Sequence, residues 1–471
     1  MNRLQLFLVS ATILSSSLCH AQLSLAWARQ YNGTLNTVDW MADMVVDKAG
    51  NTYVCGTTNV NLDPTSSDIV LLKYSPNGVL LWQRSFDGEA RGQDTGFGLA
   101  LGVNGQVFVV GRTMTLGRSS DFVTLKYRAD SGALEWAETF DGPLSSIDQA
   151  MAVATDSLGN VFVTGQVWNE NGPTVDGDFC TLKYGPQGNL LWSKVYDGPN
   201  NTIGFSDQAQ SIVVDSVGDV VVNGESPDLS SISRIATIKY RSSDGAQLWL
   251  SRSESFSLSG TPISLQVASN NDIVIGGNSQ DFGLQVTLTR LNGQTGVHQW
   301  TTRESFPHGG RLRNKACLAI DPSDNLAISV TYDPDTDNSN LNYNIQTTKY
   351  RFADGGRIWS VSYGNTNNLD GQSADAVTSD TAGNVYVAGS DLFAPNNVVS
   401  LWKYDATDGH LLWKGTYNGP KQPDVTTRIR LDQHGDIIAA GITGVDVGTG
   451  NSDIQVVKFS RKVPRLASRR T

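Results

Sequence analysis

Hydrophobic residues along the chain fall into short runs of Val, Ile, Leu, Phe and Tyr that are separated by Gly, Asp, Asn and Ser. Near the N-terminus these runs cover residues 42–47, 52–57, 69–74 and 79–86. Short runs of β-branched and aromatic residues bounded by turn residues are typical of β-strands, and no helical periodicity accompanies them. We therefore expect units of four strands, called a, b, c and d in chain order.

The unit recurs along nearly the whole chain, and its tryptophans show the period. Successive repeat tryptophans are 51 to 59 residues apart. A period of this length without a helical pattern indicates an array of β units. We expect one docked indole to join each unit to its neighbour. The repeat tryptophans are Trp27, Trp82, Trp136, Trp192, Trp249, Trp300, Trp359 and Trp413.

Two connections in each unit are tight turns. The c-to-d turn has a glycine four residues before the tryptophan, except before Trp27, where Leu23 stands. The a-to-b turn has a residue type that tolerates a left-handed backbone. In successive units this residue is Gly50, Gly105, Gly159, Gly218, Asn270, Asp324, Gly383 and Gly435.

The strand count predicts a closed ring. The chain opens with a single d strand around Trp27, continues through seven complete units and ends with an a-b-c set. Pairing of the first strand with the last three would complete eight four-stranded blades and leave no open sheet edge. We predict an all-β, eight-bladed β-propeller. Seven blades are the alternative if one degenerate unit forms no blade.

The repeat resembles a known bacterial sequence family. Residues 47–56 and 380–389 follow the pattern D-x-x-G-N-x-Y/F-V-x-G, and D-h-x-x-x-K-Y and G-x-x-x-W come after it. In these motifs the chain resembles the SBBP β-propeller repeat family. The G-x-x-x-W part is also similar to the tryptophan-docking repeat of eight-bladed quinoprotein-like propellers. The match weakens in units five and six, where Thr289, Arg290 and Leu291 replace Leu-Lys-Tyr and Val330 replaces a strand-b glycine.

The two resemblances differ in what they imply. The SBBP resemblance implies an extracytoplasmic propeller without an assigned reaction. The quinoprotein similarity would imply an alcohol or sugar dehydrogenase, a class with an adjacent cysteine pair and acidic calcium ligands. No two cysteines of this chain are adjacent. We therefore interpret the quinoprotein similarity as architecture only.

The ends of the chain are expected to lie outside the propeller. Arg3, an apolar stretch over residues 4–18, and small residues at Cys19 and Ala21 predict a signal peptide over residues 1–21. Cleavage after Ala21 is expected, and a lipoprotein site at Cys19 is the alternative. One propeller domain then covers residues 22–460. The basic residues 461–471 are interpreted as a disordered tail, with a docking element as the alternative.

Charge and cysteine content limit the classes of partner and the cellular locations that we expect for the protein. No window after the signal peptide approaches the roughly 18 apolar residues of a membrane-spanning helix, so we expect an exported, soluble protein, either extracellular, periplasmic or at the cell surface. The formal net charge of −11 disfavours nucleic acid and anionic membranes. Cys55, Cys180 and Cys317 fall in different units, which predicts buried free thiols. We expect a monomer with a protein or glycan ligand.

Ligand-binding groups are expected where the connections are irregular. The longer b-to-c and d-to-a loops meet on one face of a propeller, and loops on a rigid scaffold commonly carry function. Exposed aromatic rings there would stack on sugars or contact a partner, whereas simple loop packing is the alternative. The aromatic residues in these loops are Trp168, Phe205, Tyr332, Tyr343 and Phe393.

Calcium is the one cofactor that the sequence suggests. Asp333, Asp335 and Asp337 alternate in a single loop, and calcium prefers such oxygen ligands. However, Asn338 stands where a calcium loop would have its turn glycine, and Asn344 stands where a glutamate would follow. A solvated acidic loop is therefore the alternative.

Two polar positions recur from unit to unit. A group repeated in every blade is interpreted as part of the scaffold, bonding either to the backbone or to its counterpart across the strands. The first set is a basic residue in strand c: Lys73, Lys126, Lys183, Lys239, Arg290, Lys349, Lys403 and Lys458. The second set is an aspartate eight residues before the a-to-b turn: Asp39, Asp94, Asp148, Asp207 and Asp424.

The sequence predicts a binding or scaffolding module for a protein or glycan ligand on the loop face. An enzyme that acts on extracellular carbohydrate or another polymer from the same face is the alternative. Three or more carboxylates with shifted pKa values at the channel mouth would favour the enzyme, and an aromatic-rich face would favour the binder. No residue is assigned a catalytic role. The acidic residues best placed on the loops are Glu170, Asp176, Asp178, Glu225, Asp228 and Asp333.

Overall fold

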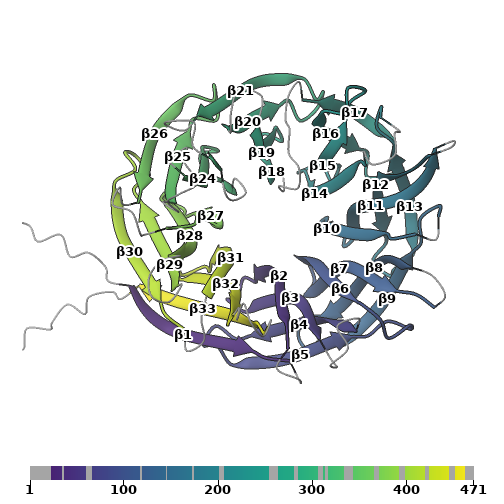
Figure 1. The fold of residues 1–471 in the computed structure, drawn as a ribbon, viewed down its shortest axis with the longest axis horizontal. Coiled ribbons are helices and arrows are strands. Elements are labelled where there is room, and N and C mark those ends of the chain that lie inside the picture. Colours follow the sequence, from purple (N-terminus) through teal and green to yellow (C-terminus); the bar gives the residue numbers. More distant parts are fainter. Residues whose placement is uncertain are drawn as a thin grey trace, which may run out of the picture.

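A computed structural model describes most of the chain, and eight sheets in it follow one another around a central opening (Figure 1). Within each sheet the strands neighbour one another in chain order, except in the last, which combines both ends of the chain. The described residues are 23–33, 37–59, 66–116, 119–144, 146–171, 174–200, 206–253, 264–279, 285–305, 311–312, 317–333, 343–364, 371–391, 398–419, 424–444 and 451–461.

The first four blades contain four strands each. Blade 1 is β2 (Asp39–Val46), β3 (Thr52–Asn59), β4 (Ser67–Tyr74) and β5 (Leu80–Phe86). Blade 2 is β6 (Thr95–Leu101), β7 (Gln106–Met114), β8 (Ser120–Arg128) and β9 (Leu134–Phe140). Blade 3 is β10 (Gln149–Thr155), β11 (Val161–Asn171), β12 (Thr174–Tyr184) and β13 (Leu190–Tyr196). Blade 4 is β14 (Gln208–Val214), β15 (Val220–Pro227), β16 (Ser233–Tyr240) and β17 (Gln247–Arg252).

The remaining blades follow the same plan with one departure. Blade 5 is β18 (Ser264–Val267), β19 (Ile273–Ser279), β20 (Gln285–Leu291) and β21 (His298–Ser305). In blade 6, both β22 (Arg311–Leu312) and β23 (Cys317–Ile320) pair with β24 (Leu326–Asp333), which is followed by β25 (Asn344–Tyr350) and β26 (Arg357–Tyr363). Blade 7 is β27 (Ala376–Ser379), β28 (Val385–Asp391), β29 (Val398–Tyr404) and β30 (Leu411–Tyr417).

Blade 8 closes the ring with the two ends of the chain. It contains β31 (Asp424–Leu431), β32 (Ile437–Thr443), β33 (Asp453–Arg461) and, on the outside, β1 (Leu23–Tyr31). β1 pairs with β33 in antiparallel fashion from Leu23 opposite Arg461 to Tyr31 opposite Ile454. The predicted eight-bladed propeller and its mode of closure are confirmed, and the seven-bladed alternative is excluded.

Side chains of the turn motif explain why it recurs. In the first a-to-b turn, the Asp47 carboxylate accepts hydrogen bonds from the backbone N–H groups of Ala49 (2.9 Å) and Asn51 (2.8 Å), and Gly50 adopts a φ of +80°. The same turn in blade 5 has its left-handed residue at Asn271, one position after the predicted Asn270. Asparagine tolerates this backbone region better than most residues do, so the turn is kept without a glycine.

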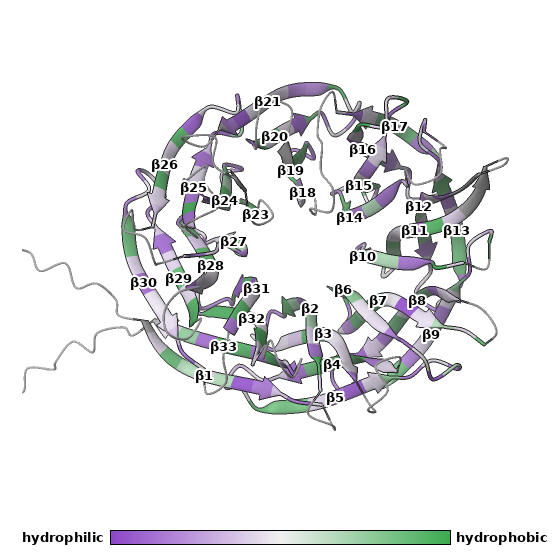
Figure 2. Ribbon diagram, in the orientation of Figure 1, coloured by the Kyte–Doolittle hydropathy of each residue, from purple (hydrophilic) through white to green (hydrophobic). Residues whose placement is uncertain are grey.

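The hydrophobic core lies between blades and not at the centre of the ring. Apolar residues are distributed through every blade (Figure 2) and form a separate buried cluster at each junction. All eight residues of β4 are buried, as expected for a strand covered on both faces. The outer strands are buried on one face only, and most residues of β5 are exposed or half-buried.

The repeat tryptophans lock neighbouring blades together. Trp192 is 8% exposed, its indole N–H donates to the Ser242 carbonyl of the next blade (3.0 Å), and its ring covers Gly245. Lys183 lies directly opposite Trp192 in the sheet and donates to the same carbonyl (2.7 Å). Trp27, Trp82, Trp136, Trp249, Trp300 and Trp359 donate to corresponding carbonyls of the following blade.

The two recurring polar sets do not pair with each other. The basic residues lie near the tight turns, where Lys239 reaches Asp215 (2.6 Å) and Lys458 reaches Asp432 (2.7 Å). The aspartates of the second set open strand a at the opposite end and accept backbone N–H groups, as Asp94 does from Gly88 (2.6 Å). The interpretation as scaffold residues bonded to the backbone is confirmed, and the proposed pairing across strands was wrong.

Candidate functional site

The ring has two chemically different faces. The tight a-to-b and c-to-d turns form one face, which we call the turn face. The b-to-c and d-to-a connections form the other, which we call the loop face. Each strand a therefore begins at the loop face and ends at the turn face.

The predicted aromatic residues do not form one cluster. Trp168 is half-buried in β11, and its backbone N–H donates to Asp148 (3.0 Å). Tyr343 is half-buried directly before β25, and its carbonyl accepts the Gln372 N–H (3.0 Å). The expected exposure of Tyr332 was wrong, because this ring is 4% exposed within the core of blades 5 and 6. Phe205 and Phe393 lie outside the described residues.

The predicted calcium loop is described at only one of its three carboxylates. Asp333 ends β24 and is 1% exposed. Asp335 and Asp337 lie outside the described residues, as do residues 1–21, which are predicted to be a signal peptide, and residues 462–471 of the predicted tail. Calcium at this loop therefore stays a prediction.

Trp40 is an exposed aromatic residue that the sequence reasoning missed. It lies at the loop-face end of β2, an innermost strand, and 53% of its surface is exposed. It is not one of the repeat tryptophans, since it directly follows Asp39 at the start of strand a. A tryptophan outside the repeat period was the signal that would have identified it.

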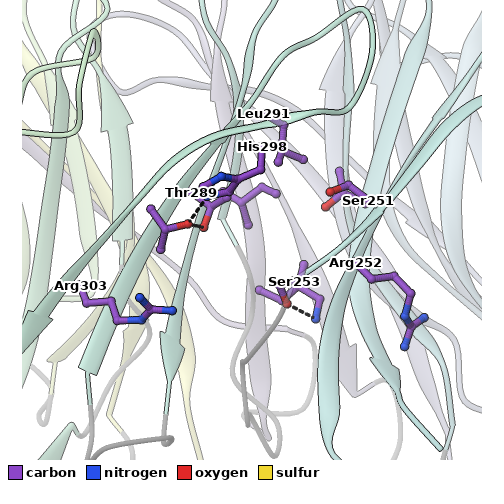
Figure 3. A pocket seen from close by; sticks show the side chains of 11 residues that line it. Ser251, Arg252, Ser253, Thr289, Leu291, His298 and Arg303 are labelled. Atoms are coloured by element: carbon purple, nitrogen blue, oxygen red, sulfur yellow. Dashed lines mark hydrogen bonds between the residues drawn. The ribbon is translucent and has the colours of Figure 1, made fainter.

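A pocket with a mixed polar and apolar lining lies between blades 4 and 5, with a volume of about 270 Å³ (Figure 3). Ser251, Arg252 and Ser253 line its blade 4 side, and Arg303 and His298 line its blade 5 side. The other lining residues are Ile235, Thr237, Ile275, Thr289, Leu291 and Thr301.

Departures from the repeat create this pocket. Four residues after the repeat tryptophan, blades 2 and 3 have Phe140 and Tyr196, which pack edge-on against Phe122 and Phe179. Blade 4 has Ser253 at that position. Leu291 also replaces the tyrosine that ends strand c in blades 1 to 4. Smaller residues leave space in an otherwise close-packed junction. The weak match of unit five was therefore the sequence signal for the pocket.

The two arginines of the pocket differ in their bonding. The Arg252 guanidinium donates to the Tyr196 hydroxyl (2.5 Å), the Ser226 hydroxyl (2.6 Å) and the Ser226 carbonyl (2.8 Å), which hold it in place. Arg303 is exposed and forms no ion pair within the described residues. His298 shares a hydrogen bond with the Thr301 hydroxyl (2.7 Å). The pocket therefore offers a guanidinium, an imidazole and several hydroxyl groups to a polar ligand.

Carboxylates gather between blades on the loop face. Three sets each bring three oxygen atoms within 4.8 Å of one another: Asp68, Asp87 and Asp94; Asp121, Asp141 and Asp148; and Asp176, Asp178 and Asp197. Burial, together with the neighbouring acidic groups, raises the pKa of Asp68 to about 6. Burial likewise raises the pKa of Asp148 and Asp207 to about 6.

Comparisons with known families define the class of protein. Residues 26–63 match the SBBP β-propeller repeat, and residues 67–282 and 236–451 match the family described as outer membrane protein assembly factor BamB. The chain is an SBBP-type, quinoprotein-like β-propeller. Because the second match spans more than half of the chain, the protein belongs to that family. No curated protein matches it.

Solved structures share the architecture at low sequence identity. A europium-containing methanol dehydrogenase is similar with a TM-score of 0.56 and 11% identity over 93% of each chain. Sqt1 from Chaetomium thermophilum, bound to the N-terminus of a ribosomal protein, is similar with a TM-score of 0.53 and 10% identity over 92% of this chain and 98% of that one. Identities this low show the fold alone. Among the described residues, no helix is long and apolar enough to cross a membrane.

Proposed function

We propose that the protein is an exported binding or scaffolding module that holds a protein or glycan ligand on its loop face, and that a glycan with acidic groups is the ligand. The observation that carries this proposal is the pocket between blades 4 and 5. It is about 270 Å³ in volume, Ser253 and Leu291 stand there in place of aromatic residues, and Arg303 and several hydroxyl groups also line it. Guanidinium groups suit planar carboxylate or sulfate-like anions, and hydroxyl groups suit sugars.

The pocket extends toward the loop-face ends of the strands that line it. Ile235 lies near the start of β16, and Arg303 lies near the end of β21, both at the loop-face ends of their strands. Trp40 adds an exposed indole elsewhere on the same face, and indoles stack on sugar rings. The solved relatives include both a dehydrogenase and a protein bound to a peptide terminus, so the choice between functions rests on the pocket.

The carboxylate clusters do not lead us to propose an enzyme. They occur at three successive blade junctions, whereas a catalytic pair is needed once in a chain. Asp94 and Asp148 also accept backbone N–H groups from Gly88 (2.6 Å) and Gly142 (2.5 Å), which fixes the loops. These contacts suit a structural or ion-binding role better than proton transfer.

The ligand proposal is tested on an array of neutral and acidic glycans, alongside a protein pull-down. We expect the wild-type protein to bind acidic glycans and Arg303→Ala to weaken that binding at least tenfold. The control is Arg128→Ala, which removes an exposed arginine on the turn face. Equal binding by wild type and Arg303→Ala would refute the pocket as the site. Absence of any glycan or protein ligand would overturn the binding function.

Export is tested separately, by determining the N-terminus of the protein after secretion. β1 begins at Leu23, so cleavage after Ala21 would leave the ring-closing strand intact. We expect the mature protein to begin at Gln22. A protein that keeps its first residues and stays inside the cell would contradict this part of the proposal.

A further inference from the structure

One carboxylate cluster contains a buried acid with an unpaired oxygen atom. Asp68, the second residue of β4, is 7% exposed, and within the described part of the chain its Oδ1 atom has no hydrogen-bond partner. Oxygen atoms of Asp68, Asp87 and Asp94 lie within 4.8 Å of one another. A buried ionised carboxylate without a partner is costly, so this arrangement needs a compensating positive charge.

The surrounding loop holds the three acids together. Asp94 donates its backbone N–H to the Ser67 carbonyl (2.7 Å), and the Ser67 N–H donates to the Gly92 carbonyl (3.1 Å). These bonds fasten the connection between β5 and β6 to the first residue of β4, beside Asp68. The Asp94 carboxylate is also fixed by the Thr113 hydroxyl (2.6 Å). The cluster is therefore organised before any ion binds.

The charges that act on Asp68 are negative. Burial is the largest cause of its raised pKa, and the carboxylates of Asp87 and Asp94 add to it. Three carboxylates thus share a small space, and Asp87 is exposed, which leaves a path to solvent.

We propose that Asp68, Asp87 and Asp94 form a calcium site between blades 1 and 2. Calcium takes oxygen ligands at about 2.3–2.6 Å, so two ligands on opposite sides of one ion are separated by about 5 Å at most. The three oxygen atoms, all within 4.8 Å of one another, satisfy this limit. Water and backbone carbonyls would complete the shell.

The positions of these acids in the repeat support a built site. Asp68 lies in strand c, five residues before the recurring basic residue of its unit. Asp87 lies five residues after the repeat tryptophan. The next junction has Asp121, Asp141 and Asp148 at the same three places. At the junction of blades 4 and 5, the strand-c place is taken by Arg234, which pairs with Asp228 (2.8 Å). At that junction the positively charged Arg234 side chain therefore occupies the position that Asp68 has between blades 1 and 2.

Calorimetric titration of the metal-free protein with CaCl₂ tests the proposal. We expect a dissociation constant of about 10⁻⁴ to 10⁻³ M, the range of extracellular calcium modules. At 10 mM calcium, a site of about 10⁻⁴ M would raise the Tm by about 3 °C in a domain of this size. Asp68→Asn is expected to remove one site from the measured stoichiometry. Asp244→Asn, an exposed turn-face acid, is the control and is expected to keep every site.

A second variant keeps the test decisive if Asp68→Asn does not fold. Asp87 is exposed, so Asp87→Asn leaves the core unchanged and is expected to weaken calcium binding at this site at least tenfold. No calcium heat from the wild-type protein would overturn the proposal. Calcium binding that is equally strong and equally stoichiometric in wild type and both variants would overturn it too.

Discussion

Replacement of Trp192 by alanine tests the idea that docked tryptophans hold the ring together. The ring of Trp192 lies between blades 3 and 4, with its centroid 6.0 Å from that of Phe162 and 6.3 Å from that of Tyr240. The indole covers Gly245, where a β-carbon would lie 2.9 Å from the ring. Alanine would leave a cavity at this junction.

The expected cost is about 3–4 kcal/mol. Truncation of a buried tryptophan typically costs about 3–5 kcal/mol through lost burial and the remaining cavity. The Ser242 carbonyl keeps the Lys183 ammonium as a donor (2.7 Å), so the lost indole N–H does not leave it unsatisfied. We therefore expect a value in the lower part of the range. With an unfolding entropy of about 2.1 cal/mol/K per residue, the Tm should fall by about 4 °C.

The measurement is urea-induced unfolding followed by tryptophan fluorescence and circular dichroism. Trp40→Ala is the matched control, because the same truncation at a 53% exposed residue should cost less than about 1 kcal/mol. Gly245→Ala should also destabilise the wild type, both through contact with the ring and through its φ of +67°. In the Trp192→Ala background the contact with the ring is lost, whereas the backbone strain and a close contact with Lys194 Cε (2.6 Å) remain. Equal stability of Trp192→Ala and wild type would refute the docking role.

Three further predictions concern the carboxylates, the thiols and the ring closure. Because the folded-state pKa of Asp68 and Asp148 is raised to about 6, the folded state takes up protons at higher pH than the unfolded state does. In EDTA the free energy of unfolding should therefore rise by about 1 kcal/mol for each group as the pH falls from 7.5 to 5.5, and the Tm should rise with it. A flat or falling Tm across that window would contradict the assignment. Cys55 and Cys180 are buried free thiols whose pKa is raised by burial, so an alkylating reagent should label them only in denaturant, as measured by peptide mass spectrometry. Labelling of the native protein would show that the thiols are accessible. Deletion of residues 1–31 removes β1 and exposes β33, so size-exclusion chromatography should show oligomers, and a stable monomer would argue against the closure.

Local sequence patterns predicted most of the fold, because each blade is specified by short-range chemistry. The Asp47 turn, with its side-chain hydrogen bonds and its left-handed Gly50, is complete within five residues. The spacing of Trp192 and Gly245 likewise follows from the repeat, since every repeat tryptophan except Trp413 covers the glycine of the next unit. The free state of Cys55 and Cys180 was also predictable, since each belongs to a different blade.

The site was harder to predict, because it depends on contacts between residues that are distant in the chain. Tyr332 looked like a loop residue, yet β24 extends far enough to bury it. The pocket between blades 4 and 5 arises where Ser253 and Leu291 meet across a junction, and neither residue alone indicates a cavity. Trp40 stood outside the repeat period and was not interpreted as a surface residue.

The sequence by itself determined the four-strand unit, the order of its strands and the way the two chain ends would close the ring, because these depend on periodic positions that can be counted. It favoured eight blades, and the structure excluded seven by showing a blade at each degenerate unit. Only the tertiary structure decided which acids meet. Asp68 is 19 residues before Asp87 and 26 before Asp94. The three acids lie close together because backbone hydrogen bonds hold the loop between β5 and β6 against Ser67. It also decided that the recurring basic and acidic sets lie at opposite ends of the blades, since antiparallel pairing places the two ends of each strand on opposite faces.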